Sequence, residues 1–272
     1  MRILSLGAGV QSSALALMAH KKYIKNIDFA VFADTGNEPD NVYEYLDYIK
    51  SIVNYDIFIV SKGNLYNDTI NNIKNNKWLD VPFFTLRDKK KGTIRRTCTH
   101  KYKINPIRKF VHSIIKEKNL RQADMLIGIS MDEIQRMTIS NVKYLKNVYP
   151  LIEKRLSRYD CVEWLKENKF KLPQRSACIM CPYHKKETLI TFMKNQKYKN
   201  LLLNLDQNLQ NNNYDKLDSE MFITNERKRI KDIDFSDTDI KQLDLFTSDC
   251  EGMCGLWYQK IDLIPKGNKL KK

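Results

Sequence analysis

The sequence contains no apolar run that approaches the roughly 20 residues a helix needs to cross a membrane. It also lacks a signal peptide, because Met1 and Arg2 lead directly into an apolar stretch typical of a core strand. We therefore expect a cytoplasmic protein with no membrane partner. Disulfides are rare in that compartment, so the six cysteines are expected to be free thiols, metal ligands or catalytic groups.

Acidic residues are too few to balance the basic ones. The chain has 32 Asp and Glu against 47 Lys and Arg, which gives a net charge of +15. Such a balance favours polyanionic partners, including nucleic acids and nucleotides. A composition rich in Lys, Asn and Ile would give the same charge without any such partner. At 272 residues, the chain can bury a substantial core in one domain and add a smaller region to it.

The sequence lacks both the Walker pattern and the dinucleotide fingerprint, yet a glycine-containing turn follows its first apolar run. Residues 3–6 predict a buried strand, residues 7–9 a tight turn, and residues 12–18 the start of an apolar helix. Backbone N–H groups and the positive end of the helix dipole would meet there, which favours a phosphate site. An ordinary strand–turn–helix connection is the alternative. The nucleotide-binding candidates in this loop are Ser5, Gly7, Ala8, Gly9, Val10, Gln11, Ser12 and Ser13.

Further strands are predicted over residues 27–33, 57–60 and 125–129, with helices between them. This alternation predicts an α/β fold with a doubly wound parallel sheet and a smaller, mainly helical C-terminal region that contains cysteines. Ligands bind such sheets outside the carboxyl ends of the strands. The polar groups expected at that edge add further nucleotide-binding candidates: Asp34, Thr35, Glu38, Gly128, Ile129, Ser130, Asp132, Glu133 and Arg136.

A basic segment over residues 95–103 contains the candidate catalytic residues. Arg96 and Lys103 lie before a helix expected to be capped by Asn105, where they could bind phosphate or sulfate and neutralise charge on a leaving group. Cys98 is the candidate reactive thiol, because cationic neighbours such as Lys101 favour the thiolate form. A buried structural thiol is the alternative.

Two closely spaced cysteine pairs indicate a metal site. Cys178 and Cys181 form a C-x2-C motif, and Cys250 and Cys254 flank a glycine. Four thiolates suit either Zn²⁺ or a [4Fe-4S] cluster. The pairs lie far apart in the sequence, so four reduced thiols in turns are the alternative. Cys161 falls in a predicted helix and is interpreted as a packing residue.

Taken together, these motifs resemble the phosphoadenosine phosphosulfate (PAPS) reductase family, within the PP-loop or adenine nucleotide α-hydrolase-like superfamily. The closest resemblance is to a branch found in phage and bacterial genomes. It implies a PP-loop nucleotide-binding domain over residues 1–156, a helical region with the cysteine cluster over 157–265, and a disordered basic tail over 266–272. The matching segments are residues 6–13, 32–38, 96–103, 128–133, 149–153, 178–184 and 250–255.

The resemblance implies an enzyme that binds an adenine nucleotide, either ATP or a PAPS-like sulfonucleotide, and performs sulfur-transfer or sulfonucleotide chemistry. Mg²⁺ is a further candidate cofactor. However, Gln11 replaces the acidic residue that helps adenylating members hold Mg²⁺. The chain also lacks the Glu-Cys-Gly-Leu-His tail that carries the reductase nucleophile. One alternative is ATP-dependent adenylation or thiolation of a nucleic acid that binds to the basic surface. The other is a non-catalytic nucleotide sensor. A homodimer is a further possibility.

Overall fold

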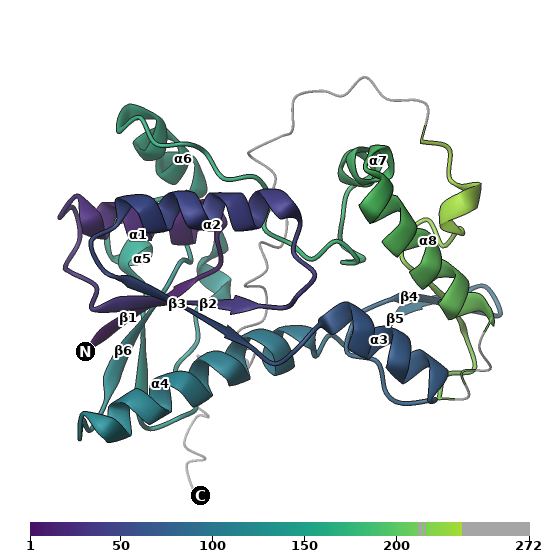
Figure 1. Cartoon of the computed structure of the whole chain (residues 1–272), viewed down its shortest axis with the longest axis horizontal. Coiled ribbons are helices and arrows are strands. Elements are labelled where there is room, and N and C mark those ends of the chain that lie inside the picture. Colours follow the sequence, from purple (N-terminus) through teal and green to yellow (C-terminus); the bar gives the residue numbers. More distant parts are fainter. Residues whose placement is uncertain (212–213, 215, 236–272) are drawn as a thin grey trace, which may run out of the picture.

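The computed structural model describes residues 1–211, 214 and 216–235. Its main sheet is parallel throughout, and helices cover both of its faces (Figure 1). The predicted α/β fold with a doubly wound parallel sheet is therefore confirmed. In spatial order, the strands are β3 (Asp56–Ser61), β2 (Phe29–Asp34), β1 (Arg2–Leu6), β6 (Ala123–Ile127) and β7 (Leu145–Val148).

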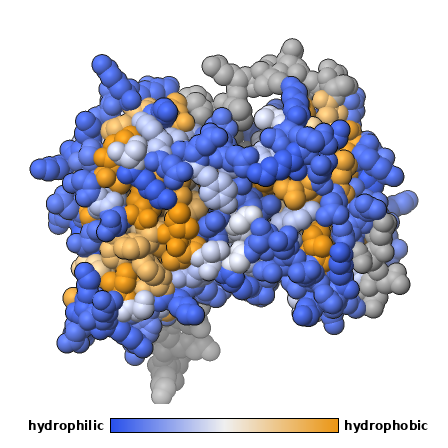
Figure 2. Space-filling model, in the orientation of Figure 1, coloured by the Kyte–Doolittle hydropathy of each residue, from blue (hydrophilic) through white to orange (hydrophobic). Residues whose placement is uncertain are grey.

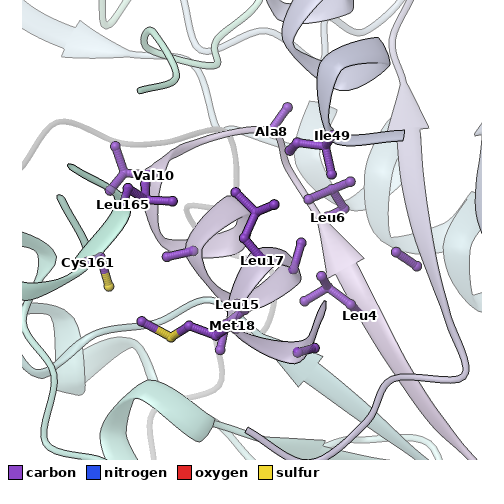
Figure 3. Close-up of a cluster of buried hydrophobic side chains, with 14 of the residues drawn as sticks. Leu4, Leu6, Ala8, Val10, Leu15, Leu17, Met18, Ile49, Cys161 and Leu165 are labelled. Atoms are coloured by element: carbon purple, nitrogen blue, oxygen red, sulfur yellow. The ribbon is translucent and has the colours of Figure 1, made fainter. Parts of the chain in front are cut away.

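The two faces of the sheet follow from the alternation of side chains along its strands. Leu4 and Leu6 point to one face, where they pack against α1 and α2, whereas Ile3 points to the other face and packs with α4. Figure 3 shows the first of these cores, in which Leu15 and Leu17 of α1 lie beside the β1 side chains. The helices of this part are α1 (Val10–His20), α2 (Asp40–Ile52), α4 (Asn105–Glu117), α5 (Pro150–Glu153) and α6 (Arg158–Glu167).

A second hydrophobic core lies beside the sheet, on the right in Figure 1. It draws residues from the ranges 65–102 and 179–233, including Phe83 and Leu202. The predicted domain boundary after residue 156 stays a prediction, although α6 packs on α1 in the first core. The elements of this region are α3 (Leu65–Lys74), β4 (Phe84–Arg87), β5 (Lys90–Thr93), α7 (Lys186–Lys194), α8 (Gln196–Asn211), β8 (Glu220–Phe222) and η3 (Ile230–Asp232).

One predicted helix start is wrong. Asn105 does not cap α4, because the chain is already helical from the π-helix η1 (Thr99–Ile104), which runs directly into it. This extension matters for the site, since η1 contains Lys103 and begins directly after Cys98. The predicted cap of α6 is confirmed: Ser157 and Asp160 form a reciprocal capping box.

The face seen in Figure 2 is mainly hydrophilic, and its apolar residues gather over the sheet on the left and over the second core on the right (Figures 1 and 2). Phe58 and Ile59 of this strand are 37% and 49% exposed. Within the described ranges, the longest helices are too short or too polar to span a bilayer. The predicted basic tail over residues 266–272 lies outside the described residues.

Candidate functional site

The order of the strands marks one crevice as the place for a ligand. From β1 the chain moves outward to β2 and β3, then returns to the other side of β1 with β6 and β7. In open α/β sheets, ligands bind at such a switch point, outside the carboxyl ends of the strands. Ser5 is in register with Ile127, so the loops that follow β1 and β6 leave the sheet side by side.

The loop after β1 leaves the start of α1 without a side-chain cap. Ala8 has a φ of 56°, which turns the backbone sharply, and Gly9 precedes the helix with no side-chain hydrogen bond to it. The Gly7 N–H donates to the Ser12 hydroxyl at 3.1 Å, and the Ser176 hydroxyl donates to the Gly7 carbonyl. The first turn contains no acidic residue. Uncapped N–H groups at a helix start favour a phosphate or sulfate group.

Gly128 brings the loop after β6 against this helix start. A Cβ atom at this position would lie 2.8 Å from the Ser12 backbone nitrogen and 3.1 Å from the Gln11 carbonyl carbon. Both are backbone atoms, which cannot rotate away. Glycine is thus required here by close approach rather than by an unusual φ.

Gln11 joins the loop to a buried polar network. Its Nε2 donates to Ser130 Oγ at 2.9 Å and to Glu133 Oε2 at 2.8 Å, and Arg158 donates to its Oε1 at 3.2 Å. Glu133 is also ion-paired with Arg136. The structure therefore brings together four residues predicted from the sequence and adds Arg158, whose helical position gave no signal of this role.

This network does not suit Mg²⁺. The Gln11 amide directs its nitrogen at Glu133 and its oxygen at Arg158, and the Glu133 carboxylate is shared between Gln11 and Arg136. A hard cation prefers carboxylate oxygens, whereas these oxygens already accept hydrogen bonds from nitrogen donors. We therefore derive no step through Mg²⁺ at this position.

A second network surrounds Glu38, whose side chain is completely buried. Its Oε1 lies 3.0 Å from Lys103 Nζ and accepts from the Thr35 hydroxyl at 3.1 Å and from the Cys178 thiol at 3.5 Å. Its Oε2 has no hydrogen-bond partner among the described residues. Burial opposes a charge on Lys103, but the Glu38 carboxylate outweighs it and raises the pKa of the ammonium group above its usual value.

A small cavity of about 40 Å³ adjoins this network and contains three thiols. The predicted catalytic residues therefore share a cavity with half of the predicted metal ligands, a grouping that no motif or spacing indicates. Lys101, the cationic neighbour expected near Cys98, pairs its Nζ with Asp80 at 2.6 Å. The polar and thiol residues that line the cavity are Thr35, Arg96, Cys98, Thr99, Lys103, Cys178 and Cys181.

The four-cysteine metal site stays a prediction. Cys250 and Cys254 lie outside the described residues. Across the described ranges, no group of three or more His, Cys, Asp or Glu side chains is arranged to hold a metal ion. Burial raises the pKa of both Cys178 and Cys181, with Glu38 adding to the shift at Cys178.

Two other candidates are occupied by structural contacts. The Asp34 carboxylate accepts from the Tyr43 hydroxyl at 2.8 Å and from the Gly36 N–H at 2.7 Å. Asp132 accepts from the Arg158 backbone N–H at 2.8 Å, at the start of α6. Asp132 belongs to the 3-10 helix η2 (Met131–Arg136) and therefore ties this helix to α6.

Cys161 is a packing residue, as predicted. Its side chain is fully buried in the core of Figure 3, and burial raises its pKa to about 12. We expect Cys161 to resist alkylation by iodoacetamide near pH 8 in the native protein and to react in urea, because a thiol must ionise and meet solvent to react. Peptide mass spectrometry measures the extent of Cys161 alkylation in each condition. Equal alkylation in the native protein and in urea would contradict the interpretation of Cys161 as a packing residue.

No protein-family model matches the chain, and a search of curated proteins gives no significant match. Among solved structures, the chain is similar to a crystal structure of phosphoadenylyl-sulfate (PAPS) reductase from Candida auris in a phosphate complex. The two chains share 12% sequence identity, and the TM-score is 0.40 over 63% of this chain and 74% of the other. At this level of likeness, the site has to be interpreted from its own geometry.

Proposed function

We propose that the protein is a PAPS reductase-like PP-loop enzyme, which binds an adenine nucleotide at the switch point between β1 and β6. The observation that carries this proposal is the uncapped start of α1, against which Gly128 presses the loop after β6. Arg136 and Arg158 place two positive charges on the same network. An anionic nucleotide end, either the phosphates of ATP or the phosphosulfate of a sulfonucleotide, fits this arrangement.

The adjoining thiol cavity supports sulfur-transfer or sulfonucleotide chemistry. Cys98 and Arg96 line it together, so a thiol and a guanidinium are available at the same place. In the proposed reaction, Arg96 and Lys103 stabilise negative charge on the leaving group. Zn²⁺ or a [4Fe-4S] cluster on Cys178, Cys181, Cys250 and Cys254 remains part of the proposal. Such a centre would supply structural support or electrons, respectively.

Isothermal titration with PAPS and with ATP tests the nucleotide site. We expect the Arg158→Gln variant to bind the preferred nucleotide roughly tenfold or more weakly, because a charge-assisted contact contributes about 1.5 to 3 kcal/mol. Lys166→Gln, on the exposed side of the same helix, is the matched control and should bind normally. Absence of binding of either nucleotide to the wild-type protein would refute the proposal.

The Cys98→Ser variant tests the reactive thiol. We expect it to retain nucleotide binding but to lose turnover, because an oxygen nucleophile of similar size is far less ionised at neutral pH. The measurement is sulfite release from PAPS in the presence of a dithiol, together with pyrophosphate release from ATP. Cys161→Ser is the control for the removal of a thiol from the chain. Full activity of Cys98→Ser would exclude Cys98 as the reactive group.

A further inference from the structure

A separate groove of about 1330 Å³ runs along the free edge of β7. It is lined by the loop over residues 137–142, by residues 22–25 after α1 and by residues of the segment 150–154. None of the residues that line the thiol cavity lies in this groove. It is therefore a distinct surface, and the proposed nucleotide site does not account for it.

The groove is strongly basic. Six basic residues line it, and two acidic residues, Asp124 and Glu153, lie among them. None of these cations forms an ion pair with another described residue, and the Lys154 ammonium lies 4.3 Å from the centre of the Tyr23 ring. Their charge is therefore available to a partner. The basic residues that line the groove are Arg2, Lys22, Lys25, Lys143, Lys146 and Lys154.

The loop over residues 137–142 is held in place by hydrogen bonds. The Thr138 carbonyl accepts from the Tyr149 hydroxyl at 2.8 Å and from Asn147 Nδ2 at 2.9 Å, and Arg108 donates to Asn141. Two buried polar atoms in the same place, Thr138 Oγ1 and Asn147 Oδ1, have no partner among the described residues. The hydrogen bonds thus give this side of the groove a fixed shape, and the two unpartnered atoms lie beneath its surface.

Apolar side chains lie between the cations. Ile139 is 82% exposed, and Met137, Val142 and Ile152 also line the groove. Together these side chains add apolar surface to the lining of a groove that is otherwise basic, and an apolar surface rimmed by polar residues is typical of an interaction site. The partner therefore has to present both negative charge and flat or apolar surface.

We infer that this groove binds a single-stranded nucleic acid. Cations spread over several chain segments match a polyanion rather than one phosphate, and counterion release would favour its binding. Unpaired bases offer apolar faces to Ile139 and its neighbours, whereas a duplex buries those faces in its own stack. A concave groove also suits a strand better than a flat bilayer.

The test is fluorescence anisotropy with a labelled RNA strand of about 12 nucleotides, a length suited to a groove of this type. We compare the wild-type protein with the triple variant Lys143→Glu, Lys146→Glu, Lys154→Glu. The matched control is Lys89→Glu, Lys90→Glu, Lys91→Glu on the exposed β4–β5 hairpin, which changes the net charge by the same amount. Melting curves verify that both variants are folded.

We expect the groove variant to bind at least tenfold more weakly at about 50 mM salt and the control to stay within about threefold of wild type. The salt slope should fall by about 2, since each phosphate contact to a single strand contributes about 0.7. Ile139→Ser should weaken binding several-fold with an unchanged slope. Equal losses in both triple variants would overturn the inference, as would tighter binding of the duplex, preference for anionic vesicles, or no binding at all.

Discussion

Replacing Lys103 with methionine is expected to lower the free energy of unfolding by about 3 to 5 kcal/mol. The substitution would leave the Glu38 carboxylate buried without its cation, and removing one partner of a buried pair is strongly destabilising. Glu38 is completely buried, and Lys103 is 14% exposed. The Thr35 hydroxyl and Cys178 thiol would remain as donors to Glu38, but neither supplies a positive charge. Urea denaturation of both proteins measures the difference.

A second substitution separates charge from packing. The double variant Lys103→Met, Glu38→Gln removes both charges and should recover a large part of the lost stability. The exposed pair Lys197–Asp40, at 2.7 Å, provides the matched control, and Lys197→Met should cost less than about 1 kcal/mol. Similar losses for Lys103→Met and Lys197→Met would show that the Glu38 network does not depend on its buried cation.

The same pair sets an alkaline limit on stability. The pKa of Lys103 is raised in the folded state, so its contribution is complete below the unfolded value of about 10.4 and is lost as the pH rises through the folded pKa. The wild-type protein should therefore lose more stability than Lys103→Met in strongly alkaline solution, as urea titrations at increasing pH would show.

Local patterns were sufficient to predict the parallel sheet, and they place the candidate site at its carboxyl edge. Residues 3–6 are an apolar run before a small-residue turn, and a buried parallel strand that leads into a helix follows from that pattern. The alternation of strands and helices then fixed the carboxyl edge as the place for polar candidates. The cap of α6 was also predictable, because Ser157 and Asp160 act within one helical turn.

The contacts between distant segments could not be predicted in this way. Cys98 and Cys178 meet at one cavity because η1 and the loop before α7 both pack against the start of α2 and α3. Arg158 reaches Gln11 across 147 positions of sequence. No periodicity or spacing encodes either contact, since each depends on how the sheet and the second core pack. The prediction that Asn105 caps a helix was wrong for a related reason. Tyr102 packs in the second core, and the chain is already helical over η1, before Asn105.

We expect Gly128→Ala to weaken nucleotide binding more than a substitution that removes a single side-chain contact at the site. The new Cβ would lie 2.8 Å from the Ser12 nitrogen and 3.0 Å from its Cα, so either the loop after β6 or the start of α1 has to move. A displaced helix start no longer directs its N–H groups at one anion. We expect binding to fall by more than tenfold, with a stability loss of about 1 to 3 kcal/mol.

A matched glycine substitution separates this local effect from a general sensitivity to added volume. Gly92→Ala places its Cβ 2.6 Å from the Thr85 hydroxyl, but that atom belongs to a side chain that can rotate, on a hairpin remote from α1. It should leave nucleotide affinity unchanged, as titration calorimetry would show. If Gly128→Ala also bound normally, the close approach of the loop after β6 to Ser12 would have no part in the site. The proposed nucleotide site would then lose its structural basis, because the same contact holds the uncapped helix start at the switch point.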